Sequence, residues 1–189
     1  MAMPQAIVIG CSAGGLTALE QLFAKLDPAL PQPIAVCCHT GSPTVDLLCE
    51  LLAKHATLPV EEARERAPMR GGVIHVAPSG YHLLVEASRR FSLSVDQRVS
   101  FARPSIDVLF ESAAEAYRDT LIGIVLTGAN SDGADGLVHV RQAGGLAVVQ
   151  DPADAEVATM PAAALERAGA DHCLPLAAIA PLLNRLCLP

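Results

Sequence analysis

Near its start, the chain carries an apolar, β-branched run that breaks abruptly at a serine flanked by glycines. The run is Ala6-Ile7-Val8-Ile9, and the break is Gly10-Cys11-Ser12-Ala13-Gly14-Gly15. Gly10, Ser12 and Gly14 fit the pattern G-x-S-x-G, in which glycines permit a sharp strand-to-helix turn. Such a turn places the serine at the positive end of the next helix, where free backbone N–H groups can hold an oxyanion. The pattern alone fits two interpretations, an exposed nucleophile and a tight turn with Ser12 as a helix cap.

The composition favours a core suited to a parallel α/β sheet. Hydrophobic residues make up 51% of the chain, aromatic residues only 3%, and there is no Trp. With 189 residues the chain suits a single domain over residues 1–189, which is long enough to bury roughly 70% of its unfolded surface. The formal charge of −7, without any run of Lys or Arg, predicts no nucleic-acid partner. Neither a long apolar run nor a signal peptide occurs, so we expect a cytoplasmic protein without direct membrane insertion.

The cysteines predict neither a disulfide framework nor a metal site. They form no C-x-x-C pair and no Cys/His group at zinc spacing, so we expect reduced, mostly buried thiols and no bound metal. Cys11 adjoins the serine, but its place at the end of a strand favours a packing role. The six cysteines are Cys11, Cys37, Cys38, Cys49, Cys173 and Cys187.

Strand-like and helical segments alternate in the order typical of a doubly wound sheet. We expect strands at 6–9, 34–38, 58–61, 72–76, 120–126 and 146–150, and helices at 15–26, 45–55, 105–117, 134–143, after Pro161, and at 176–186. The runs 81–86 and 91–95 predict a hairpin. Ser105 is expected to cap its helix, with Asp107 in the first turn. The predicted architecture is a mostly parallel, Rossmann-like three-layer α/β fold with an inserted β-hairpin.

Three polar residues follow the expected parallel strands, at the sheet edge where such folds place their sites. Ser12 ends the first strand, His39 follows the second, and Asp132 lies in a glycine-rich turn after another. A nucleophilic serine needs a base, and the imidazole needs a carboxylate to fix its tautomer. The other histidines fit helices, strands or loops: His55, His75, His82, His139 and His172. The alternative carboxylates fit helix starts or exposed turns: Asp46, Asp135 and Asp151.

Several spaced motifs together resemble one family. GCSAGGLTAL at 10–19, the strand that ends in His39, APSGYHLLVE at 77–86, RPSIDVLF at 103–110 and LTGANSDGADG at 126–136 occur in the order found in the CheB-type protein-glutamate methylesterase catalytic domain. By this resemblance, Ser12 is the nucleophile, His39 the general base and acid, and Asp132 the orienting carboxylate. The backbone N–H groups of Ala13 and Ala129 match the family's oxyanion hole.

The resemblance also implies a reaction and partners. The reaction is hydrolysis of glutamate methyl esters on the cytoplasmic helices of methylated chemoreceptors, with release of methanol, and glutamine deamidation is a second possible reaction. No cofactor is implied. The family usually carries a regulatory receiver domain, and none precedes Ala6 here, so we expect that domain to act in trans or to belong to a longer protein.

The resemblance is imperfect at two loops. Where the family usually has Thr-Gly-Met-Gly, this chain has Thr127-Gly128-Ala129-Asn130, and Thr40 replaces a common Met. A backbone donor survives the change to Ala129, and Asn130 is a residue type that enters the left-handed region readily, as the replaced glycine does.

Two interpretations from other classes stay open on sequence alone. The glycine-rich turn also resembles a damaged dinucleotide fingerprint, although a serine replaces its middle glycine and His39 stands where a ribose-binding acid is expected. The loop changes also fit a catalytically weakened receptor-binding module of the same fold.

Overall fold

Seven parallel strands, in the order β3-β4-β2-β1-β7-β8-β9, form the centre of the protein. The computed structural model describes residues 3–189. The strands of this sheet are β1 (Ala6–Cys11), β2 (Ile34–Cys38), β3 (Val60–Glu62), β4 (Ile74–Val76), β7 (Leu121–Val125), β8 (Leu146–Gln150) and β9 (His172–Leu174). A separate antiparallel pair consists of β5 (His82–Val85) and β6 (Phe91–Ser94).

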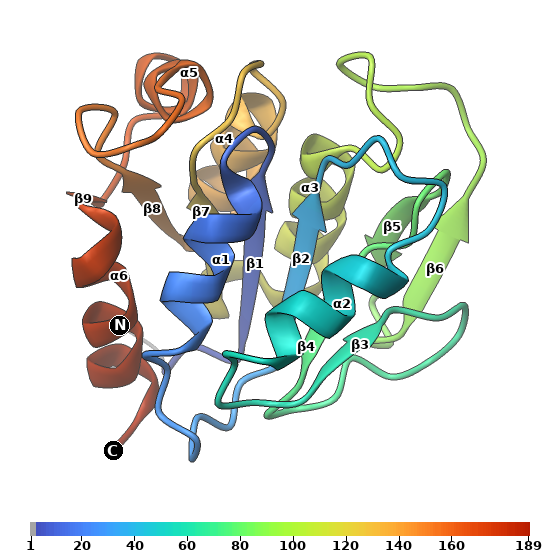
Figure 1. Ribbon diagram of the computed structural model, residues 1–189, viewed down its shortest axis with the longest axis horizontal. Helices are drawn as coiled ribbons and strands as arrows, with labels where there is room; N and C mark the ends of the chain where they lie inside the picture. The colour runs from blue at the N-terminus through green and yellow to red at the C-terminus, as the bar shows by residue number, and fades with distance from the viewer. Residues whose placement is uncertain (1–2) are drawn as a thin grey trace.

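Helices cover both faces of the sheet, which gives three layers (Figure 1). One apolar cluster joins one sheet face to α1, α2 and α6, and a second joins the other face to α3, α4, α5 and the hairpin. The alternation of β1 explains the two clusters, because Ile7 and Ile9 face the first and Val8 faces the second. The helices are α1 (Gly15–Phe23), α2 (Asp46–Ala53), α3 (Ile106–Tyr117), the 3-10 turn η1 (Arg118–Thr120), α4 (Ala134–Gln142), α5 (Thr159–Arg167) and α6 (Leu176–Cys187).

This architecture confirms the predicted parallel α/β fold with a hairpin. Every strand pair in the large sheet is parallel, and the 86–90 turn joins β5 to β6. The edge strand β9 was not predicted: it has only three residues, its burial is partial, and it lacks an apolar run. No helix among residues 3–189 has the length and apolar character needed to cross a membrane.

The central strand β1 brings three chain segments to one edge of the sheet. β2 and β7 pair with its two sides, so the segments that follow all three strands leave the sheet together. Backbone bonds continue past the strand ends: His39 N–H donates to Cys11 C=O at 3.1 Å, and Ser12 N–H donates to Thr127 C=O at 3.0 Å. This edge is the crevice where open α/β sheets place their ligands.

Gly10 allows the start of α3 to approach β1 closely. A Cβ atom at Gly10 would lie 2.3 Å from Cγ2 of Ile106, the first residue of α3 and fully buried. No side chain fits there unless Ile106 moves. The first glycine of the serine motif therefore sets the distance between the sheet and the helix that borders the candidate site.

We expect Gly10→Ala to lower the free energy of unfolding by about 1–3 kcal/mol, because overpacking of a filled core forces neighbours to shift. Urea denaturation of Gly10→Ala, Ile106→Ala and the double variant measures the coupling. The free energy of unfolding should fall less in the double variant than the sum of the two single losses, since Ile106→Ala removes the atoms that clash with the new methyl group. Strictly additive effects would contradict the close approach.

Candidate active site

The three residues predicted from the sequence lie at the same sheet edge. Ser12 follows β1, His39 follows β2, and Asp132 lies in the loop between β7 and α4. His39 Nε2 lies 2.7 Å from Oδ2 of Asp132. Ser12 and His39 both border the same two surface hollows. Within residues 3–189, the Ser12 hydroxyl makes no hydrogen bond to the imidazole or to another group.

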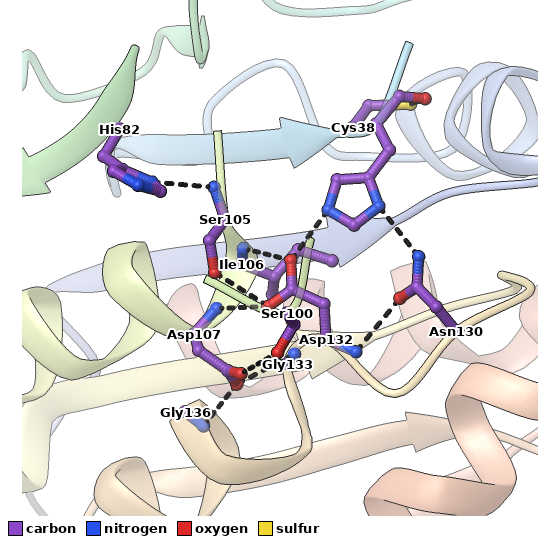
Figure 2. Close-up of polar contacts among 11 residues, drawn as sticks. Cys38, His82, Ser100, Ser105, Ile106, Asp107, Asn130, Asp132, Gly133 and Gly136 are labelled. Carbon is purple, nitrogen blue, oxygen red and sulfur yellow. Dashed lines mark hydrogen bonds and ion pairs between the residues drawn. The ribbon is translucent and has the colours of Figure 1, made fainter. Parts of the chain in front are cut away.

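Asp132 is fully buried and accepts hydrogen bonds on both carboxylate oxygens (Figure 2). Besides His39, its donors are the Ser105 hydroxyl at 2.9 Å and the N–H groups of Ile106 and Asp107 at 2.7 and 3.0 Å. Burial acts to raise the pKa of Asp132, but the bond from His39 and the other three bonds outweigh burial and lower that pKa below its ordinary value. The carboxylate therefore stays charged beside the imidazole.

The structure corrects the prediction that Ser105 caps α3 with its side chain. Ser105 occupies the N-cap position, but its hydroxyl makes no capping bond and donates to Asp132 instead. The N–H groups at the start of α3 are satisfied by Asp132, which comes from a different loop. A carboxylate from outside the helix thus performs the capping that local sequence assigned to the serine.

Asp107 has a role that its position in the first turn of α3 did not reveal. Its Oδ1 accepts the N–H groups of Gly133 and Gly136, at 2.8 and 2.7 Å, and so caps α4. Burial raises the pKa of Asp107 to about 6, the nearby charge of Asp132 adds to that effect, and the two N–H bonds oppose it. Asp132 caps α3 while Asp107 of α3 caps α4, which locks the two helices together.

His82 is a further supporting residue that the sequence did not single out. It is 2% exposed, its Nδ1 accepts the Ser105 N–H at 3.2 Å, and its Nε2 lies 2.8 Å from the Gln97 carbonyl. The ring therefore fixes Ser105, which in turn contacts Asp132. The only sequence signal for His82 is its place at the start of a strand after a glycine turn. Many histidines with purely structural roles share that placement.

Asn130 differs from its expected conformation. It is not among the residues with positive φ, and the left-handed position of this loop is Gly133, at φ 98°. The Asn130 side chain instead bridges the loop to the imidazole: Oδ1 accepts the Asp132 N–H at 3.0 Å, and Nδ2 lies 3.2 Å from His39 Nδ1 (Figure 2). Replacement of a glycine thus adds a contact to the imidazole itself.

The two N–H groups predicted for the oxyanion hole are both available. Within residues 3–189, neither the Ala13 N–H nor the Ala129 N–H donates a hydrogen bond, and both residues are exposed. Neighbouring bonds fix their loops, because the Thr127 hydroxyl donates to Ala13 C=O at 2.9 Å and Gly128 N–H donates to Val157 C=O at 3.1 Å. The assignment of these donors to an oxyanion stays a prediction.

Two hollows meet at Ser12 and His39. The leucine cleft has a volume of about 330 Å³, and its apolar wall comes from Leu16, Leu47, Leu48 and Leu51. The arginine hollow is of similar size, about 330 Å³, and includes Arg98, Phe101, Arg103 and Asn130. Thr40, where the family commonly has Met, borders both hollows. An extended substrate could cross both and pass over the serine.

The alternative residues weighed from the sequence lie elsewhere or are engaged in other contacts. His75 is buried in β4 beside Glu61, and Asp135 pairs with Arg167 on the surface at 2.7 Å.

Cys11 is buried, as predicted, and its thiol pKa is raised by a hydrogen bond with Cys38 and by burial, which makes it a poor nucleophile. Within residues 3–189 no group of three or more His, Cys, Asp or Glu side chains could hold a metal ion.

Comparison with known proteins assigns the family. A family model described as CheB methylesterase matches residues 7–183. The chain belongs to the CheB methylesterase family. A solved structure of the Thermotoga maritima CheB methylesterase catalytic domain superposes on this CheB-family chain with a TM-score of 0.93 at 30% sequence identity, and covers 97% of this chain and 98% of that one.

Relatives of this CheB-family chain differ in length. A relative from Leptospira interrogans is 47% identical over 182 residues, which are 96% of this chain and 94% of that protein. A relative from Symbiobacterium thermophilum, named protein-glutamate methylesterase/protein-glutamine glutaminase, is 37% identical over 179 residues, which are 95% of this chain and 49% of that protein. These comparisons support the esterase interpretation and neither of the two alternatives.

We expect Asp107→Asn to remove one component of the pH dependence of stability. Because burial raises the pKa of Asp107 to about 6, the folded protein binds this proton more tightly than the unfolded chain, whose Asp titrates near 3.9. The contribution of Asp107 is therefore most favourable in acid and is lost as pH rises from about 4 to 6. The asparagine keeps an oxygen for Gly133 and Gly136 but does not titrate.

Urea denaturation of both proteins at several pH values from 4 to 7 measures this effect. The free energy of unfolding of the wild type, minus that of Asp107→Asn, should fall across this window. Asp132, with its lowered pKa, titrates below the window. A difference that is flat or rises with pH would contradict the assignment.

Proposed function

We propose that this chain is a serine esterase that hydrolyses the methyl esters of glutamate side chains on methyl-accepting chemoreceptors and releases methanol. The observation that carries the proposal is the hydrogen bond between the partly buried His39 and the fully buried Asp132, which lie at one sheet edge with Ser12 in a chain of the CheB methylesterase family. The same acyl chemistry accounts for glutamine deamidation, with ammonia as the leaving group, and relatives carry both activities in their names.

His39 acts as general base through Nδ1. Since Nε2 faces the charged Asp132, Nε2 carries the ring proton, and the lone pair of the neutral ring lies on Nδ1. The Ser12 hydroxyl gives its proton to Nδ1 while Oγ attacks the ester carbonyl carbon. The imidazolium then returns that proton to the methoxide oxygen, and methanol leaves an acyl-enzyme. Water, activated by the same nitrogen, attacks the acyl carbon and regenerates Ser12.

Asp132 fixes the ring and stabilises its charged form. Its lowered pKa keeps the carboxylate ionised while the imidazole gains a proton, and its bonds to α3 hold it in place. The Ala13 and Ala129 N–H groups hold the oxyanion, with the positive end of α1 behind Ala13.

The two hollows suit a helical protein substrate better than a small free ester. A methylated glutamate reaches Ser12 from a helix that lies across the leucine cleft, whose leucines pack against the apolar part of that helix. Arg98 and Arg103 on the other side face acidic residues that neighbour the modified glutamate. Chemoreceptor helices are the proposed partner.

We expect Ser12→Ala to abolish methanol release from methylated chemoreceptor membranes while the fold stays intact. The variant removes only the nucleophilic oxygen, and that hydroxyl has no partner within residues 3–189. Methanol release by the purified chain, with circular dichroism to verify folding, measures the effect. Methanol release at the wild-type rate would reject Ser12 as the nucleophile, and another residue would then have to attack the ester.

A second variant pair tests the oxyanion hole at Ala129. Ala129→Pro deletes the N–H donor and should lower turnover about 10²- to 10³-fold, the typical loss for one oxyanion donor. Ala129→Met restores the residue common in the family, keeps the donor, and should leave turnover within a small factor. Methanol release of both variants at saturating substrate is the measurement.

Circular dichroism must show that the proline variant is folded. A folded Ala129→Pro protein with full turnover would place the second donor elsewhere in the site.

A further inference from the structure

The side-chain amide of Asn130 has a fixed orientation. Its Oδ1 accepts the backbone N–H of Asp132 at 3.0 Å, and that donor cannot reverse its polarity. The NH₂ group must therefore point the other way, toward Nδ1 of His39 at 3.2 Å. Figure 2 shows dashed lines from Asp132 and from Asn130 to the imidazole ring between them, and these two hydrogen bonds are the ones that the His39 ring makes.

The imidazole has an equally fixed tautomer. The Asp132 carboxylate can only accept, so Nε2 of His39 must donate the hydrogen bond between them. The neutral ring therefore carries its proton on Nε2 and has a single lone pair, on Nδ1. The Asn130 amide donates to that lone pair. Under the proposed function, the Ser12 hydroxyl must donate to the same lone pair before it can attack, and in this structure Ser12 makes no such bond within residues 3–189.

We propose that Asn130 is a positioning residue that restrains the base: it competes with Ser12 for Nδ1 of His39 and holds the site in a resting state. The inference rests on the proposed function. The competition is local, because Asn130, Ser12 and His39 all border the arginine hollow. A substrate that fills this hollow can turn the amide away and leave the lone pair to Ser12.

The restraint also acts on the proton-transfer step. When Nδ1 accepts the Ser12 proton it becomes a donor, and the Asn130 NH₂ then faces another donor. The contact that stabilises the neutral ring is lost as the imidazolium forms. Asn130 thus stabilises the ground state and gives nothing to the transition state, which lowers the reactivity of Ser12.

Two variants separate this role from a structural one. Asn130→Ser keeps a short oxygen that can accept the Asp132 N–H two residues on, but it is too short to reach the ring. Asn130→Asp keeps the size and the acceptor for the Asp132 N–H, but it presents an acceptor to Nδ1. The readout is the second-order rate of Ser12 phosphonylation by a p-nitrophenyl phosphonate ester, followed by mass spectrometry, which needs no receptor.

Opposite effects are expected from the two variants. Phosphonylation should be about 2- to 12-fold faster in Asn130→Ser, which is the worth of one neutral hydrogen bond. It should be slower than wild type in Asn130→Asp, because a second carboxylate holds a proton on Nδ1. ¹⁵N NMR of the His39 ring should show the Nε2–H tautomer in the wild type, and thermal unfolding verifies that all three proteins are folded.

An unchanged or lower rate in folded Asn130→Ser, while the wild type is labelled at Ser12, would overturn the role of Asn130 and leave the proposed function standing. A wild-type ring that carries its proton on Nδ1 would also overturn it. Labelling at Ser12 in none of the three proteins would instead reject the nucleophile, and both the proposed function and this inference would fail together.

Discussion

The buried carboxylate of Asp132 connects the sheet edge that carries the candidate site to the packing of the helices. An unpaired charge at a fully buried position would destabilise the fold by several kcal/mol, and four donors remove that cost. Three of those donors come from the start of α3, and the fourth is His39, at the end of β2. The same bonds that make the charge tolerable therefore hold the imidazole at a fixed place and in a fixed tautomer.

Much of this arrangement could be predicted from the sequence, because its signals are local. The apolar run before Gly10 and the position of His39 after a second run place two polar residues at the carboxyl ends of parallel strands. The parallel direction of the strands follows from the alternation of strands and helices, whereas their order in the sheet was not predicted, and the short partial strand β9 has no apolar run to mark it. The choice of Asp132 over Asp135 also followed from position, since Asp135 lies at the start of a predicted helix, where a carboxylate commonly has a structural role.

What the sequence did not reveal depends on contacts between distant segments. Ser105 and Asp107 fit ordinary capping roles within their own helix, and the structure uses both across segments 26 to 29 residues apart. Capping preferences describe which side chains can satisfy a free N–H, but they do not say which segment supplies the oxygen. The exchange of caps between α3 and α4 becomes visible only when the two helix starts are side by side.

The proposed role of Asn130 places control of reactivity in the loop after β7, outside the proposed nucleophile Ser12, the base His39 and the orienting carboxylate Asp132. A glycine at position 130 would leave Nδ1 of His39 without a side-chain donor from this position, whereas asparagine supplies one and anchors it on the Asp132 backbone. Asn130 occupies its position without a left-handed backbone, and Gly133 provides the turn into α4. Since one lone pair cannot serve two donors, the proposed mechanism lets a single residue beside Ser12, His39 and Asp132 set how readily the serine is activated.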